Sequence, residues 1–309
     1  MEYEGQICRA PMERGSFMLP VMVGCSYNRC RFCTLFKHLE YRALPLGQIE
    51  AELVRVEKAG GKPGVIFLGD GNAFDLPADR LFEILGMIQK HFPDCRAIHM
   101  DATVSGIAGK TDRELKRLCD MGVRHLYLGI EGGLEDVLSF MEKDHSIEDA
   151  YGQIGRLKNA GLIYDAHIMT GVAGNGRGIE NAERLAEFLN VTGPKRVINF
   201  SMFLHREAPL YRQIENGAFL PATELENLME ERRLLELLDP GISGQGGLQY
   251  DGFHDYIEFR VKGTLPRDKG KMLIALDQAI ARYEKEEPLV AYIEDPVWVP
   301  AVRRDRGQK

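Results

Sequence analysis

Three cysteines lie within nine residues near the start of the chain, in the segment Gly24-Cys25-Ser26-Tyr27-Asn28-Arg29-Cys30-Arg31-Phe32-Cys33. Thiolates this close in sequence can bind one metal centre without ligands from a distant part of the fold. The two arginines would lower the thiol pKa values and offset the negative charge of a sulfur-rich centre. Two metal centres fit this spacing: a zinc site with His38 as fourth ligand, or a four-iron cluster with one iron that lacks a protein ligand. Only the second leaves an open metal position for catalysis.

The cysteine segment resembles the radical S-adenosylmethionine (SAM) superfamily, whose members usually carry Cys-x3-Cys-x-aromatic-Cys after the first strand of a partial barrel. Here Phe32 supplies the aromatic residue and Cys33 the last cysteine, whereas the gap between Cys25 and Cys30 holds four residues instead of three. The longer gap is similar to that in the branch of Elongator-type, tRNA methylthiotransferase and coproporphyrinogen dehydrogenase proteins. The resemblance implies that Cys25, Cys30 and Cys33 hold a [4Fe–4S] cluster whose fourth iron chelates SAM.

Three further segments are similar to the SAM-binding motifs of that superfamily. The resemblance implies that the SAM-binding residues besides Phe32 are Gly69, Asp70, Gly71, Glu131, Thr170 and Gly171. Asp70 would accept from the SAM amino group and Glu131 from the ribose hydroxyls. Other interpretations remain open: a glycine-rich turn at 69–72, a structural ion pair at Glu131, or a phosphate-binding loop of a Rossmann-type nucleotide enzyme at 169–178.

The elements that must position these residues alternate between short apolar runs and amphipathic helices. The runs start near residues 17, 64, 97, 125, 162 and 196, at the spacing of βα units. Helices are predicted at 48–59, 77–91, 179–190 and 223–238, and after the capping boxes that begin at Thr111 and Ser146. Six parallel strands allow an open sheet or a partial barrel. With the resemblance, the predicted fold class is α/β, a partial (β/α)6 TIM-type barrel with a C-terminal cap.

The predicted organisation is a lead over 1–16, a radical SAM partial barrel over 17–238, and a cap over 239–309 that completes the substrate site. The cap contains an aromatic and charged stretch, residues 249–260, in which Tyr256, Glu258 and Arg260 alternate with apolar residues as in a strand. An exposed edge strand is the plain interpretation. The functional one places this stretch over the SAM site, with Asp251 and His254 as the catalytic residues that contact a planar substrate.

Composition narrows the range of partners. Lys and Arg number 39 and Asp and Glu number 46, a net charge of −7, which disfavours bulk nucleic acid or an anionic membrane. No apolar run is long enough to span a bilayer and no signal peptide is recognisable, so the expected compartment is the cytoplasm.

The expected function is that of a radical SAM enzyme, a lyase or an oxidoreductase, which cleaves SAM reductively and forms a 5′-deoxyadenosyl radical. That radical would abstract hydrogen from a small-molecule substrate, with flavodoxin or ferredoxin as electron donor. The alternatives are a lyase acting on a modified nucleoside or base, of the queuosine-salvage type, and a non-catalytic zinc or iron–sulfur binding protein.

Overall fold

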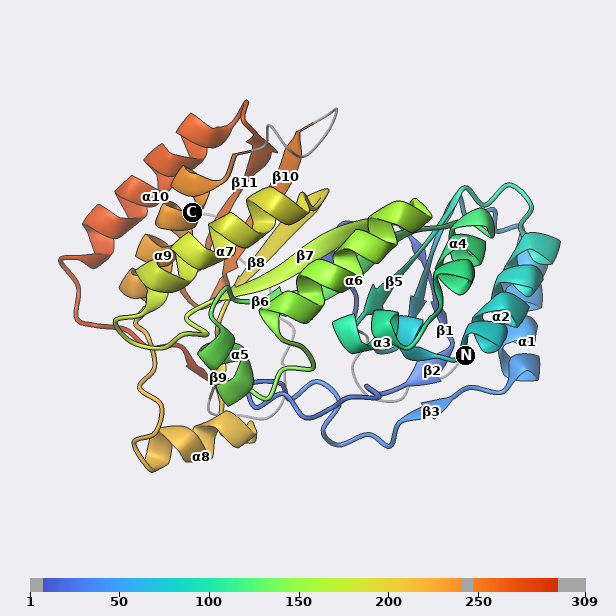
Figure 1. The fold of residues 1–309 in the computed structure, drawn as a ribbon, viewed down its shortest axis with the longest axis horizontal. Helices are drawn as coiled ribbons and strands as arrows, with labels where there is room; N and C mark the ends of the chain where they lie inside the picture. The colour runs from blue at the N-terminus through green and yellow to red at the C-terminus, as the bar shows by residue number, and fades with distance from the viewer. Residues whose placement is uncertain (1–7, 240–246, 294–309) are drawn as a thin grey trace, which may run out of the picture.

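An eight-stranded sheet forms the centre of the computed structural model, which describes residues 8–239 and 247–293 (Figure 1). The strand order is β1-β4-β5-β6-β7-β8-β10-β11, and all neighbours are parallel except β10 and β11. The strands are β1 (Phe17–Pro20), β4 (Val65–Gly69), β5 (Ala97–Ala102), β6 (Val123–Glu131), β7 (Ile163–Thr170), β8 (Arg196–Ser201), β10 (Leu248–His254) and β11 (Phe259–Leu265). The six predicted strands are therefore present, and β10 joins them as a further parallel strand.

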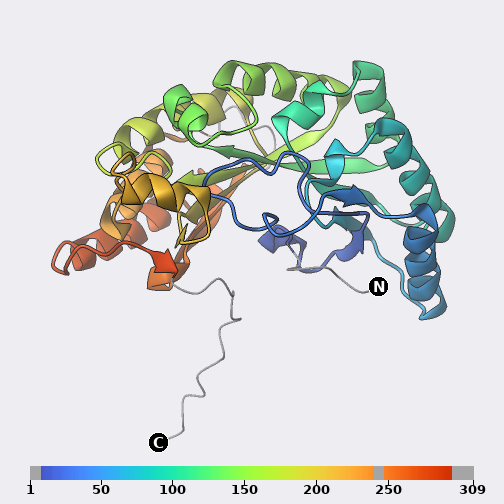
Figure 2. The ribbon, with the colours of Figure 1, turned by 90° about the horizontal axis from the view of Figure 1, so that it is seen from below.

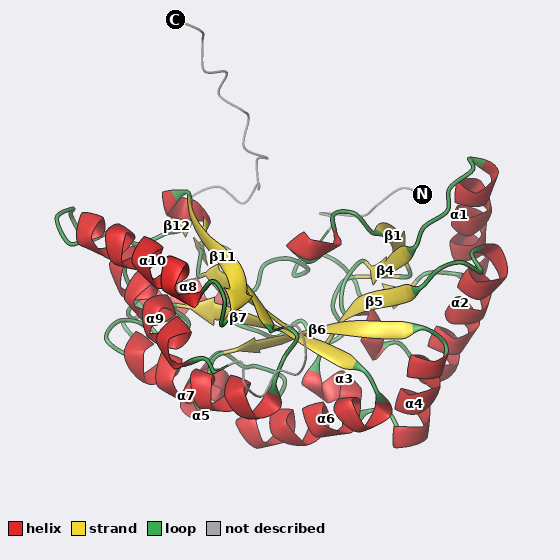
Figure 3. Ribbon diagram, turned by 90° about the horizontal axis from the view of Figure 1, so that it is seen from above, coloured by secondary structure: helices red, strands yellow, loops and turns green. Residues whose placement is uncertain are grey.

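Helices cover the convex side of the curved sheet and leave the concave side open (Figure 3). The helices of the described ranges are α1 (Leu46–Lys58), α2 (Ala78–His91), α3 (Val104–Ala108), α4 (Asp112–Asp120), α5 (Glu135–Phe140), α6 (Ile147–Ala160), α7 (Gly178–Thr192), α8 (Pro209–Glu215), α9 (Glu224–Leu237) and α10 (Lys269–Tyr283). Of these, α8 lies apart from the sheet, at the lower left of Figure 1. The predicted capping boxes start α4 and α6, and Thr223 starts α9 in the same way. The sheet does not close on itself, so the predicted partial barrel is confirmed. None of the helices in the described ranges is long and apolar enough to cross a membrane.

The two faces of the sheet differ in chemistry. Side chains facing the helices, such as Ile66, Leu68 and Leu126, are buried in the main apolar core. On the concave face, Glu13 from a 3₁₀ turn at Pro11–Glu13 accepts from Tyr127 and lies 2.8 Å from His99 Nδ1. The polar cluster of Glu13, His99 and Tyr127 lies toward the end of the barrel where the strands begin. Ligands in such folds bind at the other end, where the strands finish.

The strand predicted from the alternation at 256–260 begins only at Phe259. Strand β10 ends at His254, a 3₁₀ turn covers Asp255–Ile257, and Glu258 adopts a φ of 53° before β11 begins. The residues thus form a hairpin, because Glu258 in the left-handed region turns the chain back. Two short pairs complete the structure, β2 (Met22–Val23) with β3 (Arg42–Ala43) and β9 (Leu204–His205) with β12 (Tyr292–Ile293). Most of the predicted glycine-rich stretch at 241–247 lies outside the described residues.

Candidate functional site

The cysteine segment follows β2 and runs across the carboxyl-terminal ends of the strands (Figure 2). Its three thiols are partly buried, and burial raises the pKa of Cys30 to about 12. The thiols lie close enough to act on one another: Cys25 raises the pKa of Cys33, and Cys33 raises that of Cys30. Thiols in such surroundings stay protonated until a metal replaces their protons.

The extra residue between Cys25 and Cys30 is accommodated by Asn28. Asn28 has a φ of 44°, which asparagine tolerates better than most residues. Its Nδ2 donates to the carbonyl oxygen of Phe36 at 2.9 Å, and its backbone N–H donates to Cys25 Sγ at 3.5 Å. The longer loop is therefore a defined turn, which directs one N–H to a motif sulfur.

A carboxylate that sequence reasoning missed anchors the start of the cysteine segment. Asp75 accepts from the Ser26 hydroxyl at 2.5 Å and from the Thr103 hydroxyl at 2.8 Å. Asn72 bridges the same groups, since its Oδ1 accepts from Ser26 N–H at 3.1 Å and its Nδ2 donates to Asp75. Gly106 leaves the room, because a Cβ there would lie 1.8 Å from Asp75 Oδ1. The loops after β2, β4 and β5 are thus joined at one side chain.

The residues after α5 hold the middle of the cysteine segment. Arg31 N–H donates to the Met141 carbonyl at 2.9 Å, and its guanidinium pairs with Glu142 at 2.8 Å. Tyr27 donates its hydroxyl to the Glu142 carbonyl at 2.7 Å. The cysteine segment is therefore fixed from both sides before any metal binds.

The donor set fits an iron–sulfur cluster better than a single ion. In residues 8–239 and 247–293, no three His, Cys, Asp or Glu side chains converge as one metal ion requires. His38, the fourth ligand of the zinc alternative, is exposed. In a [4Fe–4S] cluster each thiolate binds its own iron, so the three sulfurs need to be near one another without converging.

Asp70 lies at the end of β4 beside the cysteine segment. Its carboxylate accepts from Cys8 N–H at 3.2 Å, and no cationic side chain in the described ranges pairs with it. Burial raises the pKa of Asp70 to about 6. Gly71 has a φ of 136°, and a Cβ there would lie 1.9 Å from the Gly24 carbonyl oxygen, while one at Gly69 would contact Met18. The glycines let the two loops touch, and Asp70 stays available to a cation such as an ammonium.

Glu131 ends β6 with a φ of 63° and has one cationic neighbour. Lys143 Nζ lies 3.3 Å from Glu131 Oε1 and 3.2 Å from Asp144 Oδ1. Gly129 makes the space, because a Cβ there would lie 2.4 Å from Glu131 Oε1 and 3.0 Å from Lys143 Nζ. Glu131 also raises, and Lys143 lowers, the pKa of Cys30. The carboxylate, the ammonium and the motif sulfurs therefore share one site.

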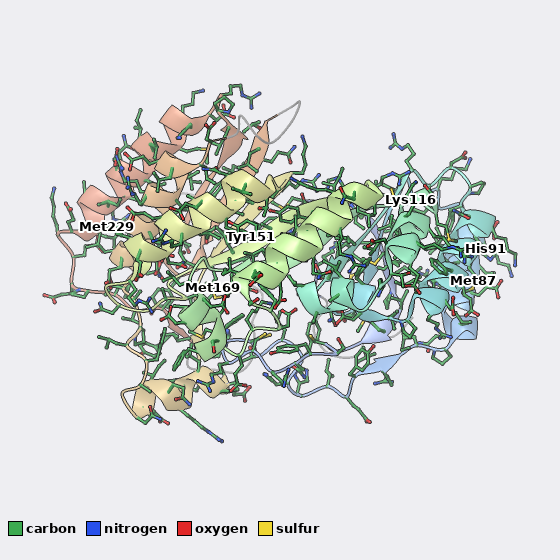
Figure 4. The ribbon with its side chains drawn as sticks, viewed as in Figure 1. Met87, His91, Lys116, Tyr151, Met169 and Met229 are labelled. Carbon is green, nitrogen blue, oxygen red and sulfur yellow. The ribbon has the colours of Figure 1, made fainter. Side chains whose placement is uncertain are left out.

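Thr170 and Gly171 end β7, and their backbone groups are already bonded within the protein. Thr170 N–H donates to Asn199 Oδ1 at 3.1 Å, and Gly171 N–H donates to Glu230 Oε2 at 2.8 Å. The next residue, Val172, packs in a second apolar cluster with Val137 of α5, against which Phe32 and Met169 also pack. Figure 4 shows Met169 beside α5. This segment can offer a ligand the Thr170 hydroxyl, which has no partner in the described residues, and an apolar surface next to Phe32.

Of the two predicted catalytic residues, His254 does not lie at the mouth of the barrel as expected. His254 is fully buried on the convex side of β10, between Glu224 and Glu231 of α9. Asp251 shares the concave face with Phe253 but forms a two-point ion pair with Arg260, at 2.7 and 2.6 Å. Both ring nitrogens of His254 are engaged by α9, so its expected placement is wrong, whereas Asp251 lies on the concave face in an ion pair.

Three other side chains on the concave face have polar atoms without partners in the described part of the chain. They are Asp101 on β5, through Oδ1, and Asp165 and His167 on β7, through Oδ1 and Nε2. Burial and the charges of Glu13 and Asp70 raise the pKa of Asp101 to about 8, and burial lowers that of His167 to about 4. Asp101 and Asp70 in turn raise the pKa of Cys8, which the sequence pattern left isolated. The strand alternation of 97–102 was the signal that could have identified Asp101.

The sequence profile of the Radical SAM superfamily matches residues 19–189 of this chain. A tRNA-2-methylthio-N(6)-dimethylallyladenosine synthase from Pelodictyon phaeoclathratiforme is 24% identical over 240 residues, covering 74% of this chain and 51% of that protein. A tRNA uridine(34) acetyltransferase from Methanocaldococcus infernus is 24% identical over 117 residues, or 38% of this chain and 22% of its own length. The chain spans about half of the first relative and less of the second.

Solved structures share the fold. Coproporphyrinogen III oxidase from Escherichia coli, described as a radical SAM enzyme, aligns with a TM-score of 0.56 and 16% identity, covering 72% of this chain and 52% of that one. Methylornithine synthase aligns with a TM-score of 0.52 and 13% identity, and the alignment covers 95% of this chain and 77% of that one. The relatives include branches that the cysteine segment resembles, so that expectation is confirmed.

Proposed function

The chain belongs to the radical SAM superfamily, which uses a [4Fe–4S] cluster to cleave SAM, and we propose that its substrate is a small molecule from which a hydrogen atom is abstracted. One observation carries the proposal. Arg31 N–H donates to the Met141 carbonyl, and Lys143, two residues further on, lies 3.3 Å from Glu131 Oε1, so the cysteine segment and the end of β6 form a single site. Chemistry at this edge of a parallel sheet is the rule for barrel folds.

Each part of the site has a role in this proposal. Cys25, Cys30 and Cys33 hold three irons, Asp70 accepts from the SAM ammonium, and Glu131 accepts from the ribose hydroxyls. Bound in this way, the cluster supplies the electron that splits SAM into methionine and a 5′-deoxyadenosyl radical. Flavodoxin or ferredoxin would deliver that electron to the protein.

The substrate would occupy the concave face between β5 and β10. Asp101 and His167 offer unpartnered polar atoms there, and Phe200 and Phe253 stack with ring centroids 5.3 Å apart. Buried polar atoms without partners are costly unless a ligand or water satisfies them. In this proposal residues 17–238 hold the cluster and SAM, and β10, from the segment after 239, completes the substrate side.

The test is anaerobic incubation of reconstituted protein with SAM, dithionite and candidate substrates, followed by mass spectrometry. Formation of 5′-deoxyadenosine that increases with a small metabolite, which itself changes mass, would support the proposal. The product then separates a lyase, whose products sum to the substrate, from an oxidoreductase. A tRNA arm is needed because two relatives are named for tRNA modification. Turnover of tRNA alone would reject the small-molecule assignment.

A further inference from the structure

Helix α9 buries three of its carboxylates and exposes one methionine. Glu224, Glu230 and Glu231 are at most 2% exposed, whereas Met229, labelled in Figure 4, is 41% exposed. An ordinary surface helix does the reverse, and carboxylates are almost never fully buried unless they are paired. The partners of these three carboxylates therefore show what α9 does.

Two of the carboxylates are satisfied within α9 and the sheet. His254 lies 3.3 Å from Glu224 Oε2 through Nδ1 and 3.0 Å from Glu231 Oε2 through Nε2. Glu231 Oε1 also accepts from Asn199 Nδ2 at 2.9 Å and from the Tyr250 hydroxyl at 2.8 Å. These contacts attach α9 to β8 and β10.

Glu230 differs, because its two oxygens face Gly171, which follows β7, and Asn181, which lies on α7. Its Oε2 accepts from Gly171 N–H at 2.8 Å, and its Oε1 accepts from Asn181 Nδ2 at 2.7 Å. Asn181 Oδ1 in turn accepts from Gly133 N–H at 2.8 Å. Gly178, the first residue of α7, comes so close that a Cβ would lie 3.0 Å from Glu230 Oε2. Glu230 thus bonds directly to Gly171 after β7 and, through Asn181 of α7, connects to Gly133 after β6.

We propose that Glu230 is a positioning residue for SAM, which acts through Asn181 to fix the segment after β7 relative to the segment after β6. The inference rests on the proposed function, in which those segments flank SAM. Both neighbours of Glu230 are donors, so both bonds form only with the ionised carboxylate. Burial raises the pKa of Glu230 to about 7, the nearby charge of Glu231 acts in the same direction, and that of His254 opposes it.

The Glu230→Gln variant tests this geometry. A carboxamide has one acceptor oxygen, so its NH2 group must face either Gly171 N–H or the Asn181 amide. SAM affinity is expected to fall by about tenfold, the value of one lost charge-assisted hydrogen bond at the low end of its range, at unchanged iron content. The measurement is equilibrium dialysis of SAM against the anaerobically reconstituted protein.

The double variant Glu230→Gln/Asn181→Asp restores the hydrogen bonds by moving the negative charge from residue 230 to its partner, residue 181. The carboxamide at 230 then accepts from Gly171 N–H and donates to the carboxylate at 181, which still accepts from Gly133 N–H. The double variant is expected to regain most of the SAM affinity, whereas Asn181→Asp alone places two carboxylates in contact and binds weakly. Glu236→Gln is the control, since Glu236 lies on the same helix but is exposed, and its carboxylate pairs with Arg232 and Arg233.

The possible results distinguish a failure of the proposed function from a failure of the positioning role of Glu230. Wild-type protein that holds iron but does not bind SAM would overturn the proposed function itself. Wild-type affinity in Glu230→Gln, or lower thermal stability with unchanged affinity, would overturn only the positioning role. If Glu230→Gln fails to fold, a folded double variant decides: near-normal affinity supports the role, and affinity as weak as that of Asn181→Asp overturns it. The affinity gap between wild type and Glu230→Gln should also narrow as the pH falls from about 8 to 6, because wild-type Glu230 then becomes protonated.

Discussion

At the scale of single residues, burial rather than basic neighbours controls the cysteine chemistry. Burial is the largest influence on Cys25, Cys30 and Cys33 and raises the pKa of each thiol. The arginines expected to lower these pKa values are engaged elsewhere: Arg31 pairs with Glu142, and Arg29 lies over the Tyr27 ring. The cation that does act on Cys30 is Lys143. The thiols are thus neutral in the free protein, and they become thiolate ligands when a metal displaces their protons.

Replacing one motif cysteine should prevent cluster assembly. In Cys30→Ala, two thiolates remain, too few for a cluster with three protein ligands. Iron content after anaerobic reconstitution should fall to background, with loss of the broad visible absorption. Cys95→Ala is the matched control, because Cys95 is a partly buried thiol that packs against the main core. Equal iron in wild type and Cys30→Ala would contradict the cluster assignment.

Glu131→Gln keeps the shape of the side chain and removes its charge. If the carboxylate accepts from SAM, affinity should fall by about 1–3 kcal/mol, the range of hydrogen bonds to charged groups. The titration should be made with SAM on protein whose iron content equals that of wild type. Unchanged affinity would make Glu131 only the structural partner of Lys143.

At the scale of elements, the residues that end each strand were easier to predict from the sequence than the face of the sheet that a residue occupies. Asp70 and Glu131 end strands, so their common edge is a consequence of parallel pairing alone. His254 was misplaced because the sequence does not show that Glu224 and Glu231 of α9 cover the face of β10 on which it lies. The hairpin at 255–258 depends on Glu258 adopting a positive φ, for which the local sequence has no glycine or asparagine signal.

Asp75 offers a test of how the cysteine segment is positioned. In Asp75→Asn, an NH2 group must face one of three donors: the Ser26 hydroxyl, the Thr103 hydroxyl or Asn72 Nδ2. Stability should fall by about 1–3 kcal/mol, the cost of an unsatisfied buried group. Iron loading should be slower and less complete. Urea unfolding and timed reconstitution measure the two effects, and wild-type values in both would show that Ser26 needs no anchor.

At the scale of the whole molecule, buried titratable groups gather on both faces of the same sheet. Asp101 on the concave face has a pKa raised to about 8, and His254 on the convex face has one raised to about 9. Sequence patterns cannot show this, since the partners of His254 lie 30 and 23 residues away along the chain. His254 was expected over the SAM site, whereas the packed helix α9 makes it a charged core residue.

The stability of the molecule should therefore fall as the pH rises from about 6.5 to 9. The unfolded imidazole has a pKa near 6.5, whereas Glu231 and Glu224 hold the folded pKa of His254 at about 9 against the opposing effect of burial. The folded state binds the extra proton in this interval, so its stabilisation is complete below about pH 6.5 and is lost as the pH passes 9. The loss attributable to His254 is on the order of 3 kcal/mol. Urea unfolding at several pH values should show this decline in wild type and a weaker one in His254→Gln. Parallel pH profiles in the two proteins would show that His254 is not the group that titrates.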